Sequence, residues 1–283
     1  MSDLALRLGF AADDRVVLVC CDELGFSHAA NVATYAALRS GTATSASLMV
    51  PAPWSRGAAA AYRGEDVGCN LTLNAELDLY RWGPITHAPS LLDGDGGFPR
   101  TVTDVWEHAD LDEVRREWRA QVERAIYWGF DVSHLDAHLG GVEMKPEFFD
   151  AYLDLAEELR LPVRLPDAEL EPRVGFPFRS LADERGILAP DRSLPLTALG
   201  RTLGEALASL PPGVSELHAH PAPDAPEMRL AAPDWERRVD EHALLSPGGP
   251  LAEALARTGA RLVGYRELRE AMRAGRSGTS DFA

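Results

Sequence analysis

Residues 16–25 read VVLVCCDELG, a run of six apolar residues that leads directly into two acids. A continuous apolar run rich in β-branched residues is typical of a strand that is buried on both faces, as in a parallel sheet. Ser27 is a suitable N-cap for a helix that begins near His28, and Gly41 would end that helix. The stretch therefore predicts one strand–loop–helix unit of an α/β fold.

The same unit recurs along the chain. Further strands are predicted at 44–50, 67–73, 132–136, 161–165, 215–219 and 261–263, and further helices at 55–62, 111–128, 146–159, 196–210, 235–244, 251–256 and 265–274. Strands and helices that alternate at short spacing indicate right-handed βα crossovers. We expect a single TIM-like (β/α) barrel with about seven parallel strands over residues 1–275, and a mobile tail over 276–283.

Two long stretches interrupt this rhythm. Residues 78–108 have the composition of a loop, and a loop of that length in a compact domain is usually functional. Residues 166–195 are rich in proline and charge, and only a turn of helix near Leu181 is expected there.

The composition and charge of the chain argue against several classes of partner and location. The chain has 283 residues with 28 basic and 44 acidic side chains, a net charge of −16, which argues against nucleic acid or an anionic membrane surface as a partner. No apolar run approaches the roughly 20 residues of a membrane span. The three cysteines are too few for a disulfide framework, and the N-terminus lacks an export signal, so we expect reduced thiols and a cytoplasmic protein.

Polar residues stand where several of the predicted strands end. In parallel α/β folds the carboxyl ends of the strands meet at one mouth, where ligands bind. Asp22 and Glu23 would repel each other there unless a cation or a proton stabilises them. The alternative is that one acid caps the following helix and the other is solvated.

Histidines follow two later strands. His138 comes two residues after Asp136, which lies on the same face of the extended segment and could orient the imidazole. A lone histidine after a strand is more often structural than a ligand. His220 precedes Pro221, a rigid place for a proton donor, and His218 points the same way.

Motifs along nearly the whole chain resemble the YdjC-like (ChbG/HpnK) carbohydrate deacetylase family. They read VCCDELGFS (19–27), GTATSASLMV (41–50), VGCNLTL (67–73), PSLLD (89–93), SHLDAH (133–138), ELHAHP (216–221) and RLVGYREL (261–268), in the order of the family. The resemblance implies a seven-stranded TIM-like barrel and a divalent metal that helps water remove acetyl groups from N-acetylated sugars.

Carried over by position, the family motifs assign roles to individual residues. Asp22 would be the general base, Glu23 and His138 metal ligands, and His220 the general acid. Asn70 stands where the family has a histidine ligand, and an amide oxygen is a poor ligand for zinc though acceptable to harder ions.

Two other departures also bear on the metal. Glu23 replaces the usual aspartate, and Gly140 replaces a second histidine. We therefore expect a divalent metal that is either magnesium or zinc. A loop residue, Glu76, Glu143 or His87, could supply a replacement ligand.

We therefore expect a carbohydrate N-deacetylase, a hydrolase of a linear amide C–N bond, that acts on N-acetylated sugars or short oligosaccharides. Trp54, Tyr80, Arg81 and Trp82 could form a rim that stacks on sugar, or the two tryptophans could simply pack in loops. Two alternatives are a sugar-binding homologue that has lost part of its metal site, and a glycosidase with Glu23 in an acid–nucleophile pair about 5 Å apart. The expected partner is a small carbohydrate, and a homodimer is left open.

Overall fold

The computed structural model describes residues 3–200 and 202–277. Residues 278–283 of the predicted mobile tail lie outside the described residues, and residues 276–277 belong to the last helix.

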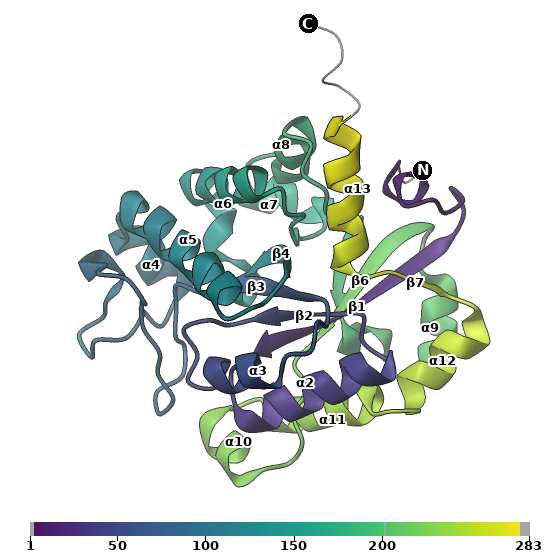
Figure 1. Cartoon of the computed structure of the whole chain (residues 1–283), viewed down its shortest axis with the longest axis horizontal. Helices are drawn as coiled ribbons and strands as arrows, with labels where there is room; N and C mark the ends of the chain where they lie inside the picture. Colours follow the sequence, from purple (N-terminus) through teal and green to yellow (C-terminus); the bar gives the residue numbers. More distant parts are fainter. Residues whose placement is uncertain (1–2, 201, 278–283) are drawn as a thin grey trace, which may run out of the picture.

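A curled parallel sheet of seven strands forms the centre of the molecule (Figure 1). Its strands are β1 (Arg15–Leu24), β2 (Ser45–Leu48), β3 (Val67–Leu71), β4 (Val132–Ala137), β5 (Arg192–Pro195), β6 (Gly213–Ala219) and β7 (Arg261–Leu262). The order is β4-β3-β2-β1-β6-β5, and β7 pairs with the beginning of β1. Every residue of β1 after Arg15 is buried, so the prediction of a strand covered on both faces is confirmed.

The sheet curls into a TIM-like half-barrel. The predicted strand at 161–165 was wrong as a regular strand, because only an isolated parallel bridge joins Val163 to Leu135 of β4. Pro162 and Pro166 flank this bridge, and proline has no N–H to donate to a ladder. Val163 also donates its N–H to the carbonyl of Leu188 at 2.9 Å, so this segment lies between β4 and the chain that leads to β5.

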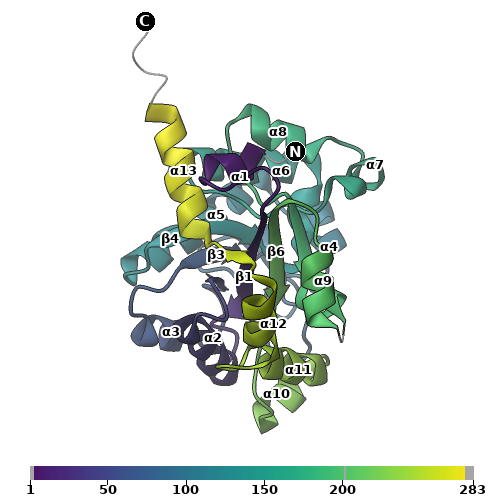
Figure 2. The same ribbon diagram turned by 90° about the vertical axis from the view of Figure 1, so that its right-hand side faces the viewer.

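Helices surround the sheet (Figures 1 and 2). They are α1 (Asp3–Arg7), α2 (His28–Ser40), α3 (Ser55–Ala61), α4 (Val102–His108), α5 (Leu111–Tyr127), α6 (Pro146–Leu159), α7 (Glu171–Val174), α8 (Phe178–Glu184), α9 (Leu203–Ser209), α10 (Pro226–Ala231), α11 (Trp235–Leu245), α12 (Pro250–Thr258) and α13 (Tyr265–Ser277). Short 3₁₀ turns are η1 (Pro89–Leu91), η2 (His138–Gly140), η3 (Val142–Met144), η4 (Ala168–Leu170) and η5 (Leu196–Leu199).

The predicted helix ends of α2 are confirmed. Ser27 accepts a hydrogen bond from the N–H of Ala30 at 3.0 Å, and Gly41 adopts the left-handed conformation at the other end, with φ +76°. The single helix predicted at 196–210 was wrong, because Gly200, with φ +62°, separates η5 from α9.

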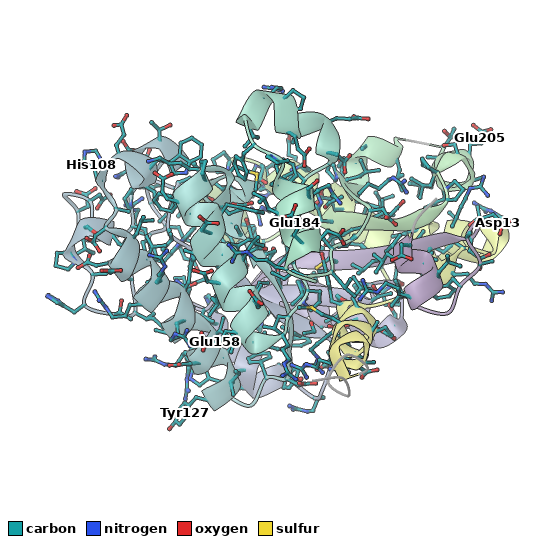
Figure 3. All side chains as sticks on the ribbon, turned by 90° about the horizontal axis from the view of Figure 1, so that it is seen from above. Asp13, His108, Tyr127, Glu158, Glu184 and Glu205 are labelled. Atoms are coloured by element: carbon teal, nitrogen blue, oxygen red, sulfur yellow. The ribbon has the colours of Figure 1, made fainter. Side chains whose placement is uncertain are left out.

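Apolar side chains fill most of the space between the sheet and the helices, and many charged side chains lie on the outer surface. Val114, Trp118 and Val122 are buried on one face of α5, which confirms the helix predicted at 111–128. The exposed acids Asp13, Glu158 and others project from the outer surface in Figure 3. Among the described residues, no helix is both long enough and apolar enough to span a bilayer.

Candidate functional site

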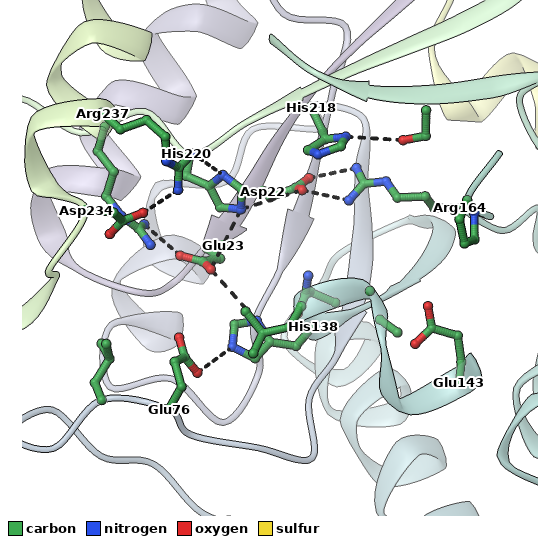
Figure 4. Close-up of a pocket in the computed structure, with 18 of the residues that line it drawn as sticks. Asp22, Glu23, Glu76, His138, Glu143, Arg164, His218, His220, Asp234 and Arg237 are labelled. Atoms are coloured by element: carbon green, nitrogen blue, oxygen red, sulfur yellow. Dashed lines mark hydrogen bonds and ion pairs between the residues drawn. The ribbon is translucent and has the colours of Figure 1, made fainter. Parts of the chain in front are cut away.

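A cavity of about 550 Å³ opens where the carboxyl ends of β1, β3, β4 and β6 meet (Figure 4). It is lined by Asp22, Glu23, Asn70, Glu76, Leu77, Ala137, His138, Leu139, Gly140, Glu143, Arg164, Pro166, Ser193, His218, His220, Pro233, Asp234, Arg237 and Arg238. The two acids, Asn70, His138 and His220 therefore converge on one pocket, as the strand ends predicted. The surrounding chain fixes the position and the charge of each of these side chains.

A local departure from regular strand geometry directs Glu23 into this pocket. The pairing of β1 with β2 shifts register between Cys21 and Leu24, and Glu23 has a φ of +59°. A non-glycine residue with positive φ is strained and persists only where its surroundings hold it. Leu139, directly after His138, has a φ of +61°. The segments that carry Glu23 and His138 thus each contain a left-handed residue, whereas β3, which carries Asn70, contains none.

Arg164 is the centre of charge beneath Asp22. Its guanidinium donates to the two carboxylate oxygens of Asp22 at 2.7 and 2.8 Å, to Asp136 at 2.9 Å, and to Glu216 at 2.7 and 2.9 Å. Burial alone would raise the pKa of Asp22, but Arg164 holds that pKa well below its usual range. Asp22 is therefore ionised at neutral pH and can accept a proton.

Arg238 pairs with Glu23 as Arg164 pairs with Asp22. It is buried over the ring of Phe26, at 4.8 Å from the ring centroid, and donates to Glu23 Oε2 at 2.7 Å and to Asp234 at 2.9 Å. Burial favours the neutral form of Glu23, yet Arg238 with His220 and His138 lowers the pKa of this carboxyl to about 2. With Oε2 held, Oε1 is left facing His138 and His220, each at 3.8 Å.

Three of the lining residues could hold a metal ion. Glu23, Glu76 and His138 each offer a ligand atom, and these atoms lie within 4.8 Å of one another. Glu76 Oε2 lies 3.0 Å from His138 Nε2. Burial alone would lower the pKa of His138, but the contact with Glu76 raises it. Two carboxylates and an imidazole are a suitable donor set for magnesium or zinc.

Asn70 and Asp136 have partners other than those expected. The amide nitrogen of Asn70 donates to Asp136 at 2.9 Å, and its oxygen lies 3.3 Å from the hydroxyl of Thr72. Asp136 also accepts from Ser47 at 3.1 Å and from Arg164, and the carboxylate hydrogen-bonded to His138 is that of Glu76. A metal-binding role for Asn70 and an orienting role for Asp136 stay predictions, and Glu76 is the better placed third ligand.

His220 stands on the opposite wall from His138 (Figure 4). Its Nε2 lies 3.9 Å from Asp22 Oδ2, and its Nδ1 lies 3.2 Å from the guanidinium of Arg237. The backbone N–H of His220 donates to Glu241 at 2.7 Å, which fixes the end of β6 against α11. The imidazole is therefore held where it can hydrogen-bond to a group that lies between Asp22 and Glu23.

The four residues predicted to form a sugar-stacking rim do not line the cavity. Trp82 is buried, donates to the carbonyl of Asn74 at 2.9 Å and packs edge-on against His138, with the centroids 5.9 Å apart. Tyr80 donates to the carbonyl of Phe26 at 2.6 Å, and Arg81 pairs with Asp93.

Trp54 is 44% exposed beside His28, outside the cavity. In this structure Tyr80, Arg81 and Trp82 hold the 78–108 loop, so their contact with a sugar stays a prediction.

Arg164, Arg238 and Arg237 are the site residues that the sequence did not single out. Arg164 had a signal, since it is a charged residue inside the apolar run 161–165. Arg237 and Arg238 had none, because they lie in an ordinary amphipathic helix and reach the pocket only through the packing of α11.

Comparison with known proteins finds relatives over most of the chain. The family model for YdjC-like protein matches residues 16–254. A carbohydrate deacetylase from Thermus thermophilus is 37% identical over 259 residues, which cover 86% of this chain and 90% of the relative. A carbohydrate deacetylase from Geobacillus stearothermophilus is 29% identical over 262 residues, or 89% and 98% of the two chains.

The fold also has a counterpart among solved structures. A crystal structure of a protein from Enterococcus faecalis superposes with a TM-score of 0.73 at 23% identity, over 90% of this chain and 99% of the other. The likeness supports the half-barrel architecture.

Proposed function

The chain belongs to the YdjC-like family, and from this premise we propose that it is a metal-dependent carbohydrate deacetylase. Its substrate would be an N-acetylated sugar or a short oligosaccharide of such sugars, and the bond hydrolysed would be the amide C–N bond of the acetamido group. The relatives named as carbohydrate deacetylases support this substrate class.

One observation carries the proposal. Asp22, the three candidate ligands Glu23, Glu76 and His138, and His220 all line one cavity, at the ends of different strands and in the loop after β3. Hydrolysis of an amide needs a base for the water, a group that stabilises charge on the carbonyl oxygen, and an acid for the departing amine. The cavity brings candidates for all three together.

The roles follow from the charges. Arg164 keeps Asp22 ionised, so Asp22 can take the proton from the attacking water. His220, on the other side of Asp22, can give a proton to the amine as the C–N bond breaks. A divalent cation, magnesium or zinc, bound by Glu23, Glu76 and His138, would supply Lewis-acid polarisation of the acetyl carbonyl. The products are acetate and a sugar with a free amino group.

Acetate release from N,N′-diacetylchitobiose tests this directly. We expect the wild-type protein to release acetate, and Asp22→Asn to release it at least about a hundredfold more slowly, because a general base contributes about that much or more. Asp224→Asn is the matched control, since Asp224 pairs with Arg229 on the surface. Full acetate release by Asp22→Asn would remove the assigned base. Release of free N-acetylglucosamine without acetate would replace the deacetylase with a glycosidase.

A further inference from the structure

One carboxyl group in the cavity has no part in the proposed reaction. Glu143 lines the cavity from η3, and its side chain is 3% exposed. Its Oε2 has no hydrogen-bond partner among the described residues. In Figure 4 it lies on the other side of Arg164 from His218, away from the candidate metal ligands.

The neighbours that could have paired with Glu143 are committed elsewhere. A guanidinium has five N–H donors, and all five of Arg164 are used on Asp22, Asp136 and Glu216. The hydroxyl of Tyr152 donates to the carbonyl of Leu135 at 2.8 Å. None of the described residues therefore donates a hydrogen bond to this oxygen of Glu143.

The segment around Glu143 is also held in place. Trp106 Nε1 donates to the carbonyl of Val142 at 2.8 Å, and Lys145 Nζ donates to the carbonyl of Trp106 at 2.9 Å. Lys145 pairs with Glu147, 2.9 Å away, which leaves Glu143 without that cation. This segment therefore holds Glu143 at the cavity wall, with its Oε2 buried and without a hydrogen-bond partner among the described residues.

An unpaired buried carboxyl group is costly. Burial raises the pKa of Glu143 to about 7, which shows how strongly its surroundings disfavour the charged form. Buried polar groups in proteins nearly always have a hydrogen-bond partner, so an exception inside a ligand cavity points to a partner that comes from outside.

We propose that Glu143 is a substrate-binding residue whose carboxyl group hydrogen-bonds to a ring hydroxyl of the sugar. This assignment rests on the proposed function for the identity of the ligand, and it extends that function by placing the sugar ring on the Arg164 side of the cavity. A carboxyl group suits this role because it can accept from a hydroxyl when ionised and also donate to one when protonated. Glu143 acts on binding and takes no part in bond cleavage.

The test compares Glu143→Leu, Glu143→Gln and the surface control Asp224→Asn, with N,N′-diacetylchitobiose as the probe. We expect Glu143→Leu to raise KM at least tenfold with kcat within threefold of the wild-type value. Glu143→Gln, which keeps the size and can still accept and donate, should stay within about threefold in KM. The control should match the wild-type protein.

Melting temperature separates binding from a structural role. If Glu143 serves the ligand, removal of its unpaired carboxyl group leaves the melting temperature of both variants equal to or above that of the wild-type protein. A fall of more than about 5 °C in both variants would identify Glu143 as structural and overturn the proposal.

The outcome also separates this proposal from the proposed function. If the wild-type protein releases no acetate, the sugar is not consumed, and the same comparison is made by calorimetry with Kd in place of KM. A tenfold weaker Kd in Glu143→Leu would then support the sugar-binding role although the deacetylase had failed. A KM or Kd within twofold of the wild-type value, or no binding by the wild-type protein, would overturn the role of Glu143.

Discussion

At the scale of single residues, the site is defined by how its carboxylates are neutralised. Asp22 is ionised because Arg164 pairs with it, and Glu23 because Arg238 does. The sequence predicted that adjacent acids at a strand end need a partner. It could not show that two arginines, more than a hundred residues away, would pair with these acids in addition to any bound cation. Such pairing depends on the packing of the whole chain.

The pKa of Asp136 is shifted in the opposite direction to that of Asp22. Arg164 faces three buried carboxylates with one positive charge, and burial together with Asp22 and Glu216 raises the pKa of Asp136 to about 7, against the effect of Arg164. Its hydrogen bonds go to Ser47, Asn70 and Arg164 in the barrel interior. Spacing alone placed Asp136 on the face of His138, but it could not distinguish a partner of the imidazole from a member of this interior network.

Glu143 gives a prediction for the pH dependence of stability. Its pKa is raised from an ordinary value of 4.5 to about 7, so between these values the unfolded chain loses the proton while the folded chain retains it. Stability from this group is complete below pH 4.5 and is lost as the pH rises through 7, by up to roughly 3 kcal/mol.

Urea unfolding at a series of pH values measures this effect. Glutamine does not titrate, so the free energy of unfolding of Glu143→Gln should gain on that of the wild-type protein as the pH rises from 4.5 to 7.5. A constant difference between the two proteins across this range would contradict the buried, unpaired state of Glu143.

At the scale of elements, the sequence predicted the units that build the mouth of the barrel. The strand at 16–21, the helix after Ser27 and the helix at 146–159 lie where the patterns indicated. The strand is a continuous apolar run, the helix after Ser27 has a side-chain cap and a glycine stop, and the helix at 146–159 has an apolar face and a proline at its first position. These signals are local in the sequence. The misses are elements without such signals, as in β5, which has four residues that include a proline.

The turn from β1 into α2 offers a prediction at this scale. Gly25 and Gly41 both have positive φ, at +98° and +76°. A Cβ on Gly25 would lie 3.0 Å from Ser55 Cα and 3.1 Å from the carbonyl oxygen of Met49, whereas a Cβ on Gly41 would meet nothing within 4 Å. Gly41→Ala therefore reports the backbone strain alone, and Gly25→Ala adds a steric clash to it.

We expect Gly41→Ala to lower the free energy of unfolding by about 1 kcal/mol, and Gly25→Ala to lower it by at least about 1 kcal/mol more. Urea unfolding of both variants beside the wild-type protein measures the difference. Equal losses would mean that the chain after Glu23 has more room than the structure shows.

At the scale of the whole molecule, a half-barrel brings together residues that are far apart in the sequence. The catalytic candidates come from the ends of β1 and β6, and the candidate metal ligands come from β1, the loop after β3, and the residue after β4. The rule that ligands bind at the carboxyl ends of parallel strands predicted this convergence. It could not select Glu76 over Glu143 or His87 as the third candidate ligand. The path of a loop cannot be predicted from the spacing of apolar residues.

We propose that Glu23, Glu76 and His138 hold one divalent cation that deacetylation requires. The most direct measurement titrates zinc or magnesium into metal-stripped wild-type protein, Glu76→Gln and Glu147→Gln, and follows ion binding and acetate release on the same samples. We predict one ion per chain, acetate release that rises with occupancy, and at least about tenfold weaker binding in Glu76→Gln only. Full acetate release without an ion, or equal affinity in Glu76→Gln, would contradict the claim.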